Sequence, residues 1–261
     1  MVTRNVVLLS VLFVGIVLGS CSWWSLKSND LNEQLDIGPL PDFSAFKVVT
    51  EKKQTFFNYF STLSDAVNQE IRADRERLMA LRGIEDIGDD DTAWLIALAD
   101  HYGLNLSEPI GAASLDVLLQ RVDELPNSLV LAQAAIESAW GTSRFAKKGR
   151  NFFGQWCYSK GCGLVPSARS KTASHEVKVF ESPLDSVRAY FDNLNRNAAY
   201  KSLRRLRTQA RESGQSLSGC RLAEGLKGYS ELGAKYIAQV KRVIRTNGLE
   251  KSPYCNKPPK Q

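Results

Sequence analysis

Histidine is almost absent from this chain of 261 residues, since it occurs only twice. His101 and His175 have no cysteine or second histidine at a spacing typical of zinc ligands, so we predict no metal site and no cofactor. His101 closes an apolar helical pattern and is expected to be structural. Neither histidine is an evident partner for a cysteine nucleophile. This scarcity argues against both a metalloenzyme and a thiol enzyme.

Internal repeats, low-complexity tracts and nucleic-acid-binding motifs are also missing, which argues against a repeat array and a nucleic-acid partner. An apolar fraction of 43% can fill one large core or two small ones. The formal charge of +6 is the sum of an acidic N-terminal half and a basic C-terminal half. Residues 1–125 carry 10 basic and 19 acidic side chains, whereas residues 126–261 carry 24 basic and 9 acidic ones. The basic half favours an anionic polymer, either a nucleic acid or a cell-wall glycan with carboxylates and phosphates, and charge by itself does not choose between them.

An apolar run over residues 6–18 is short for a membrane span and suits the core of a signal peptide. It leads into Leu18-Gly-Ser-Cys21, which resembles the cleavage box of bacterial lipoproteins, where the cysteine is lipidated. We therefore predict a lipoprotein signal over 1–21 and a membrane anchor at Cys21. The alternatives are an ordinary cleaved signal and an uncleaved anchor. Serine after Cys21 favours the outer membrane by resemblance to lipoprotein sorting, so the predicted location is the periplasmic cell envelope.

The five cysteines become four if Cys21 is lipidated, and four cysteines in an exported protein are typical of two disulfides. An exported thiol also tends to oxidise, which disfavours a free cysteine nucleophile. Four cysteines allow three connectivities, of which we favour a pair of Cys157 and Cys162, because these two are close enough in sequence to close a local loop. Cys220 and Cys255 then remain as the other pair.

One carboxylate, Glu137, lies inside an otherwise apolar run over residues 129–141. The apolar positions recur at helical spacing, which predicts a core helix that starts near Pro126 and ends at Gly141. Burial favours the neutral form of a glutamate and raises its pKa, the condition that a general acid needs near neutral pH. The alternative is a buried structural glutamate, because structural networks also perturb carboxylates.

The segment that follows favours the catalytic interpretation. The combination of AQAAIESAWG, a short connection and Asn151-Phe-Phe-Gly154 resembles the glucosaminidase domains of bacterial cell-wall hydrolases, and the overall pattern is most similar to the Bax group. The resemblance covers about the C-terminal half of the chain. It implies an α+β, mainly helical fold, in which a lysozyme-like helical domain carries a small β-lobe. It also implies that Glu137 is the catalytic acid and that peptidoglycan glycan strands are the substrate.

We predict five segments along the chain. They are a signal over 1–21, a tether over 22–60, a helical region over 61–125, a glucosaminidase-like catalytic domain over 126–250 and a tail over 251–261. Aromatic residues from Phe43 to Phe60 are expected to pack against the domain. In the helical region, apolar spacing and start signals predict helices over 61–81, from Asp89 to about 103, and over 114–125.

A small β-lobe is predicted over residues 152–181, because 151–157 and 175–180 have strand-like composition. The resemblance implies that the glycan lies between this lobe and the helices. A second catalytic group is normally needed, and Glu176 on the lobe is the first candidate, although a strand surface residue is the plain alternative. Glu181 and Asp185 are further candidates. If no second carboxylate reaches the groove, the acetamido oxygen of the substrate takes this role.

The end of the chain resembles the late tyrosine motif of the family, with a departure in spacing. We favour Tyr229 as the active-site tyrosine and place Tyr236 second, with packing in the core as the alternative for Tyr236. A final helix is expected over 232–246, ended by Asn247 and Gly248. Four further residues are predicted to contact sugar rings, although Phe153 and Trp156 also suit the core of the lobe. They are Trp140, Phe153, Gln155 and Trp156.

Ser182-Pro183 with Asp185 predicts a helix start, in which serine caps the helix. The arginine-rich stretch that follows is interpreted mainly as a solvated face that could attract a polyanionic wall. It contains Arg188, Arg196, Lys201, Arg204, Arg205, Arg207 and Arg211.

The sequence thus predicts a monomeric peptidoglycan hydrolase that cleaves the β-1,4 bond after N-acetylglucosamine. A lytic transglycosylase with the same acid and a non-catalytic cell-wall-binding lipoprotein are the alternatives.

Overall fold

The computed structural model describes residues 38–106, 110–167, 169 and 173–257. The chain divides into a unit of residues 1–38 and a unit of residues 39–261, and the second unit contains the elements below. The predicted signal, Cys21 and the tether up to residue 37 lie outside the described residues. Within the described ranges, no helix combines the length and apolar character needed to cross a membrane.

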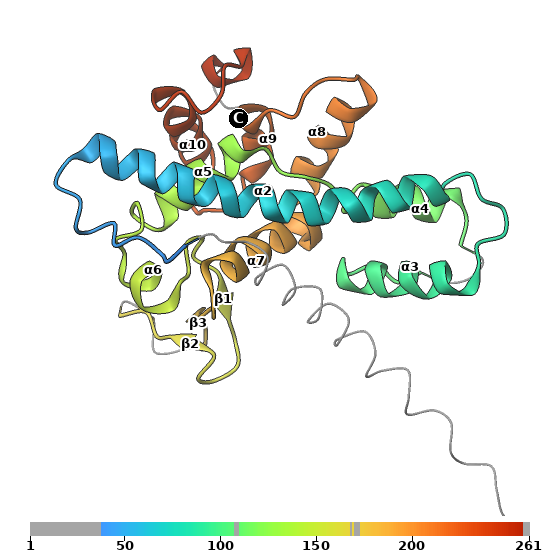
Figure 1. Ribbon diagram of the computed structural model, residues 1–261, viewed down its shortest axis with the longest axis horizontal. Coiled ribbons are helices and arrows are strands. Elements are labelled where there is room, and N and C mark those ends of the chain that lie inside the picture. Colours follow the sequence, from blue (N-terminus) through green and yellow to red (C-terminus); the bar gives the residue numbers. More distant parts are fainter. Residues whose placement is uncertain (1–37, 107–109, 168, 170–172, 258–261) are drawn as a thin grey trace, which may run out of the picture. The chain divides into compact units, whose positions relative to one another are not determined.

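The long helix α2 (Val49–Leu81) runs across the unit (Figure 1) and starts well before the predicted residue 61. Phe56 and Phe60 are completely buried, and Phe43 just before the helix is 2% exposed. Burial of aromatic rings at helical spacing extends the helix, because each ring removes a large apolar area from water. The predicted tether was therefore too long, since residues 39–60 belong to the folded unit.

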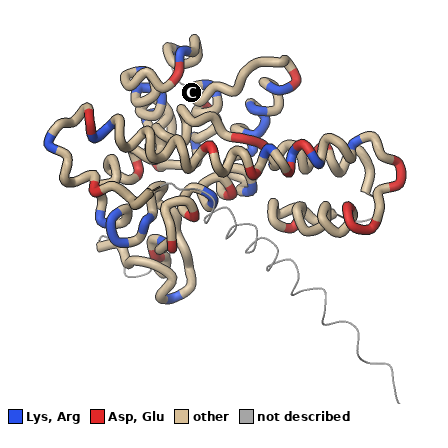
Figure 2. The backbone as a smooth tube through the Cα atoms, in the orientation of Figure 1, with Lys and Arg blue, Asp and Glu red and all other residues tan. Residues whose placement is uncertain are grey.

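Two shorter helices lie beside one end of α2 (Figure 1). Helix α3 (Asp89–His101) begins with three aspartates, as predicted, and acidic side chains in a first turn complement the helix dipole. Figure 2 shows a cluster of acidic residues along the backbone around this start. Helix α4 (Ala112–Leu119) ends before the predicted residue 125. The carbonyls of Leu119 and Gln120 at its end accept hydrogen bonds from the Arg75 and Arg207 side chains, which satisfy acceptors that a helix end leaves unpaired.

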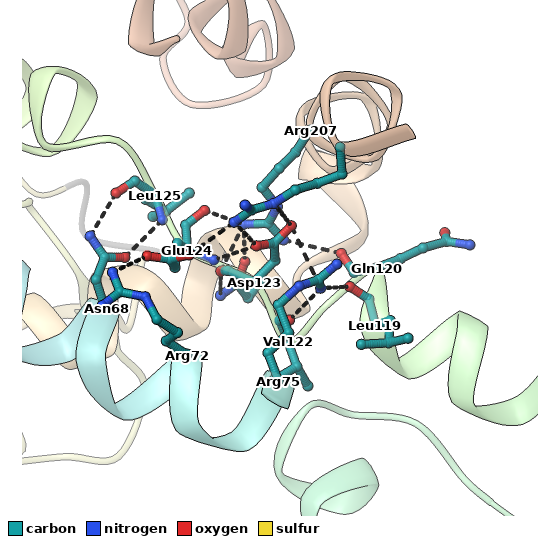
Figure 3. A network of polar contacts seen from close by, with 12 residues as sticks. Asn68, Arg72, Arg75, Leu119, Gln120, Val122, Asp123, Glu124, Leu125 and Arg207 are labelled. Carbon is teal, nitrogen blue, oxygen red and sulfur yellow. Dashed lines mark hydrogen bonds and ion pairs between the residues drawn. The ribbon is translucent and has the colours of Figure 1, made fainter. Parts of the chain in front are cut away.

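These arginines surround Asp123 in a buried polar network (Figure 3). The Asp123 carboxylate is 3.7 Å from the Arg75 guanidinium, 3.4 Å from that of Arg207 and 2.7 Å from that of Arg211. Arg207 is completely buried, and burial lowers its pKa to about 10. Arg204 is also buried. The solvated-face interpretation was therefore wrong for Arg204 and Arg207, which join helices instead of facing solvent.

Helix α5 (Asn127–Glu137) forms the centre of the unit and contacts α2, α9 (Gly219–Leu222) and α10 (Ala234–Thr246). Its side chains from Leu129 to Ala135 are at most 6% exposed, which explains the continuous apolar run. Helix α10 ends at Thr246, as predicted, and Asn247 is its C-cap residue.

Helix α7 (Pro183–Arg196) starts as predicted. The Ser182 side chain accepts a hydrogen bond from the Asp185 backbone N–H, and the Asp185 carboxylate accepts one from the Ser182 backbone N–H. Such reciprocal capping satisfies two backbone donors that a helix start otherwise leaves unpaired. The remaining helical elements are α6 (Arg144–Gly149), η1 (Ala198–Tyr200), α8 (Lys201–Glu212), η2 (Ala223–Leu226) and η3 (Pro253–Asn256).

Three short antiparallel strands form the predicted β-lobe in the order β1-β3-β2. They are β1 (Trp156–Cys157), β2 (Gly163–Leu164) and β3 (Glu176–Lys178). The predicted disulfides are confirmed, with Cys157 to Cys162 in the lobe and Cys220 to Cys255 between α9 and η3. The α+β, mainly helical fold with a small β-lobe is also confirmed.

Candidate active site

The central helix α5 ends at Glu137, not at Gly141 as predicted. Ala139, Trp140 and Gly141 have φ values of 50°, 59° and 76°, so three successive left-handed residues turn the chain away. The Ser138 hydroxyl stabilises this turn, because it donates to Ala134 O and accepts from Gly141 N. The carboxylate consequently lies at the C-terminal end of a helix, where the helix dipole disfavours negative charge.

Glycine is required at position 141 by packing as well as by conformation. A Cβ atom there would lie 2.2 Å from the Phe43 ring, far inside any real contact. The turn after α5 is thus fitted against the aromatic cluster before α2.

Two opposing effects act on the acidity of Glu137. Its side chain is half-buried, and burial raises its pKa. The Tyr236 hydroxyl donates a hydrogen bond of 2.6 Å to Glu137 Oε1, which lowers the pKa. Burial is the larger effect, so the pKa stays above that of a free glutamate. This environment suits a residue that must hold a proton until the transition state.

A chain of hydrogen bonds leads to this carboxylate from the interior. The Tyr190 hydroxyl donates to Gln133 Oε1 at 2.6 Å, and Gln133 Nε2 is 2.9 Å from the Tyr236 hydroxyl oxygen. An amide nitrogen can only donate, so this bond directs the Tyr236 proton towards Glu137. Gln133 is completely buried and lies one helical turn before Glu137 on α5. The sequence analysis missed both Gln133 and Tyr190, although a glutamine four residues before the acid was a usable signal.

Glu137 lines a cleft of about 1080 Å³. The β-lobe forms one side of the cleft, and the C-terminal half of α7 with Tyr200 and Tyr229 forms the other. The lobe and the helices are therefore arranged as predicted, with a groove beside the acid. This groove is large enough for several sugar rings, since typical ligand sites occupy about 300–1,000 Å³.

The turn from Asn151 to Gln155 holds the lobe over the acid. The buried Asn151 amide donates to Gln155 O and Lys178 O, each at 2.9 Å, and accepts from the N–H groups of Phe153 and Gln155. Gly154 has a φ of +68°, and a Cβ atom there would lie 3.7 Å from Glu137 Oε2. The NFFG motif thus brings backbone, with no side chain, next to the carboxylate.

Three of the predicted sugar-contacting residues line the cleft, namely Phe153, Gln155 and Trp156. Phe153 is 2% exposed and stacks on Tyr190, so it supports the wall more than it offers a free face. Trp156 is 55% exposed and stacks on His175 with ring centroids 4.0 Å apart. Tyr158 is 71% exposed at the same border.

Trp140, the fourth predicted sugar-contacting residue, lies outside the cleft lining. Its ring packs against Phe56 and Phe57 with centroids 5.7 and 5.2 Å away. The left-handed turn after α5 takes the side chain towards α2. The expected sugar contact at Trp140 is therefore replaced by a packing contact.

The structure gives Glu176 a different role from the one predicted. Its carboxylate accepts hydrogen bonds from Gly161 N at 3.1 Å and Gly163 N at 2.8 Å, and these bonds lower its pKa. The side chain is 6% exposed and is not among the residues that line the cleft. Glu176 thus holds the loop between β1 and β2.

The other predicted carboxylates are also outside the cleft lining. Glu181 is exposed beyond the lobe, and Asp185 caps α7. Among the described residues, Glu137 and Asp192 are the acidic side chains that line the cleft. Asp192 Oδ1 lies 3.0 Å from His101 Nε2, and this contact gives His101 the structural role that was expected.

Both predicted tyrosines lie beside the acid, but the order of preference changes. Tyr236 makes the direct contact with Glu137. Tyr229 stacks on Tyr236 with ring centroids 5.4 Å apart, and its hydroxyl donates to Phe153 O at 3.0 Å. Tyr229 therefore borders the cleft and links the helices to the lobe, whereas Tyr236 contacts the Glu137 carboxylate.

Two groups of described residues have the composition of a metal site, each made of a disulfide and one carboxylate. Disulfide sulfurs are not the thiolates that bind metals, so neither group offers a ligand set.

Comparison with known proteins identifies relatives across most of the chain. The family model named Glucosaminidase, described as mannosyl-glycoprotein endo-beta-N-acetylglucosaminidase, matches residues 114–249. Protein bax of Escherichia coli K12 is 33% identical over 197 residues, which is 76% of this chain and 70% of the relative. The catalytic domain of the autolysin Auto from Listeria monocytogenes aligns with 86% of this chain and 95% of that chain, with 18% identity and a TM-score of 0.41.

Proposed function

We propose an activity from the premise that this chain belongs to the glucosaminidase family. The enzyme hydrolyses the β-1,4 bond after N-acetylglucosamine in peptidoglycan glycan strands, and Glu137 is the general acid. One observation carries the proposal. A carboxylate with a raised pKa lies at the wall of a cleft large enough for a glycan, at the position where the family motif has its acid.

The two oxygens of Glu137 have different surroundings. Oε1 accepts the Tyr236 hydrogen bond, whereas Oε2 is the oxygen near Gly154 and the lobe. We assign the acidic proton to Oε2. It passes to the glycosidic oxygen as the bond to the sugar C1 breaks, and the Tyr236 hydroxyl then stabilises the carboxylate that remains.

The second group in this proposal belongs to the substrate. Glu176 binds backbone N–H groups of the loop between β1 and β2 and does not line the cleft. Asp192 lines the cleft, but its carboxylate is paired with His101. The acetamido oxygen of the N-acetylglucosamine unit attacks C1 as the leaving group departs. Water then opens the cyclic intermediate and gives a proton to the Glu137 carboxylate, which restores the acid. Two displacements at C1 retain its configuration.

Glu137→Gln tests the acid. Glutamine preserves size and the hydrogen bond from Tyr236 but cannot donate an acidic proton, so cleavage is expected to fall by about 10²-fold or more. The measurement is mass spectrometry of digested glycan strands, with circular dichroism as the check on folding. Asp192→Asn is the matched control and is expected to keep cleavage within about tenfold. A loss on Asp192→Asn as large as on Glu137→Gln would replace substrate assistance with a pair of carboxylates.

The same digest separates the alternatives. A reducing N-acetylglucosamine end supports hydrolysis after that sugar, whereas a 1,6-anhydromuramyl end identifies a lytic transglycosylase with the same acid. Binding of glycan strands without any cleavage identifies a non-catalytic wall-binding protein.

We also propose that Cys21 anchors the protein to the outer membrane, facing the periplasm. The support is the Leu-Gly-Ser-Cys pattern after the apolar run. Cys21→Ser is expected to prevent incorporation of radiolabelled fatty acid and to move the protein from the membrane to the soluble fraction. Continued labelling of that variant would contradict the assignment.

A further inference from the structure

A second cleft of about 840 Å³ adjoins the one that contains Glu137. Arg121 lines both clefts, and its guanidinium donates to Tyr102 O at 2.6 Å and to Arg196 O at 3.0 Å. These contacts fix Arg121 at the boundary between them. Beyond it, the second cleft follows the solvent-facing side of α8. We call this second cleft the basic groove.

The basic groove is strongly positive. Four cationic side chains and one carboxylate, that of Glu212, line it. Arg204 is buried and uses its guanidinium to bind two backbone carbonyls. Lys201 and Arg205 are exposed, and the ion pairs among the described residues involve neither of them. These two side chains provide the charge that is available to a ligand.

The positions of these cations are unfavourable for the helix itself. Lys201 and Arg205 are four residues apart on α8, so they lie on the same face and repel each other. Lys201 is also the first residue of α8, where the helix dipole favours an acidic side chain. A bound anion would relieve both effects.

We propose that the basic groove binds the carboxylates of the peptide stems on glycan strands held in the Glu137 cleft. The proposal rests on the proposed function, because it requires peptidoglycan as substrate. Stem peptides leave the glycan at every muramic acid and carry several carboxylates, whereas the sugar ring at the acid is neutral. The exposed Arg196 lines the Glu137 cleft and continues the positive surface from that cleft to Lys201.

The test compares two substrates. One is a set of glycan strands with intact stems, and the other is the same strands after an amidase has removed the stems. The stripped strands keep one lactyl carboxylate on each muramic acid, so the comparison isolates the stem carboxylates. Lys201→Glu is expected to lower kcat/KM for stem-bearing strands by about two- to fivefold, the range of an exposed ion pair. Its kcat/KM for stripped strands is expected to stay unchanged.

Folding does not confound this variant. Glutamate at position 201 forms a favourable pair with Arg205 and complements the helix start, so Lys201→Glu should be at least as stable as wild type. Arg242→Glu is the matched control, because Arg242 is exposed on α10 and lines neither cleft. The stem preference of wild type should also weaken in high salt, which screens exposed charges.

Three results would overturn the proposal, and a fourth would refute the proposed function. Equal losses of Lys201→Glu on both substrates, or equal losses in Lys201→Glu and Arg242→Glu, would show general attraction of a polyanion and overturn the proposal. Unchanged cleavage of stem-bearing strands by Lys201→Glu overturns it as well. Failure of wild type to cleave stripped strands and stem-bearing strands alike would refute the proposed function instead.

Discussion

At the scale of single residues, the acidity of Glu137 depends on Tyr236. The Tyr236 hydroxyl donates a hydrogen bond to Glu137 and lowers the pKa of that carboxyl. In the proposed mechanism it also stabilises the carboxylate left after proton transfer. Gln133 and Tyr190 contribute indirectly, because they fix the direction of the Tyr236 hydroxyl. In the proposed mechanism, Tyr236 and Gln133 are therefore positioning residues for Glu137.

This gives a prediction about pH. A general acid works only when protonated, so activity falls as pH rises through the pKa of Glu137. Tyr236→Phe removes the bond that lowers this pKa, so the pKa rises and the alkaline limb of the kcat/KM profile moves to higher pH. The maximal rate is expected to fall by about ten- to a hundredfold, because a hydrogen bond to a charged group is lost.

Gln133→Leu provides a graded comparison. It keeps the Tyr236 hydroxyl but removes the donor that directs it. The alkaline limb of the kcat/KM profile should therefore also move to higher pH, by a smaller amount than in Tyr236→Phe. If Tyr236→Phe and Gln133→Leu both lower the rate but leave the alkaline limb of the kcat/KM profile at the wild-type pH, these residues act only through packing.

At the scale of elements, the end of α5 decides where the acid is presented. The three left-handed residues after Ser138 stop the helix, and Gly141 fits against Phe43. The predicted continuation to residue 141 followed from apolar spacing alone. Spacing does not reveal a left-handed turn at Ala139 and Trp140, since neither residue favours that conformation.

Gly141→Ala tests this turn. The added methyl group both strains a positive φ and collides with the Phe43 ring, so the free energy of unfolding is expected to fall by about 2–4 kcal/mol. Gly214→Ala is the control, since Gly214 has a φ of +62° with nothing within 4 Å of an added Cβ. That control should lose about 1–2 kcal/mol in urea unfolding. Similar losses in both variants would show that the contact with Phe43 is unimportant.

At the scale of the whole unit, the network around Asp123 joins segments far apart in the sequence. Arg75 comes from α2 and Arg207 from α8 (Figure 3), and Arg211 also belongs to α8. The network therefore connects the predicted helical region to the catalytic domain. It also supports α8, which carries the basic groove.

Asp123→Asn should be strongly destabilising. Removal of the carboxylate leaves the buried Arg207 charge without its anion, and the expected loss in the free energy of unfolding is about 3–5 kcal/mol. Glu124→Gln breaks the more exposed ion pairs with Arg72 and Arg211 and should cost about 1 kcal/mol or less. Denaturant unfolding measures both. Equal costs would mean that burial of the network contributes little.

The sequence alone determined the features that depend on neighbours along the chain. The glutamate in an apolar helix, the capping box at Ser182 and the short disulfide loop from Cys157 to Cys162 could be predicted from local spacing and chemistry. The pair of Cys220 and Cys255, 35 residues apart, followed only as the pair that remained. Tertiary structure decided which distant segments meet. It placed Tyr236 within hydrogen-bonding distance of Glu137 and buried Arg207. It also placed the Glu176 carboxylate where it accepts a hydrogen bond from the loop glycine Gly161. A polar side chain takes the partner that folding places within hydrogen-bonding distance, and local spacing carries no record of that partner.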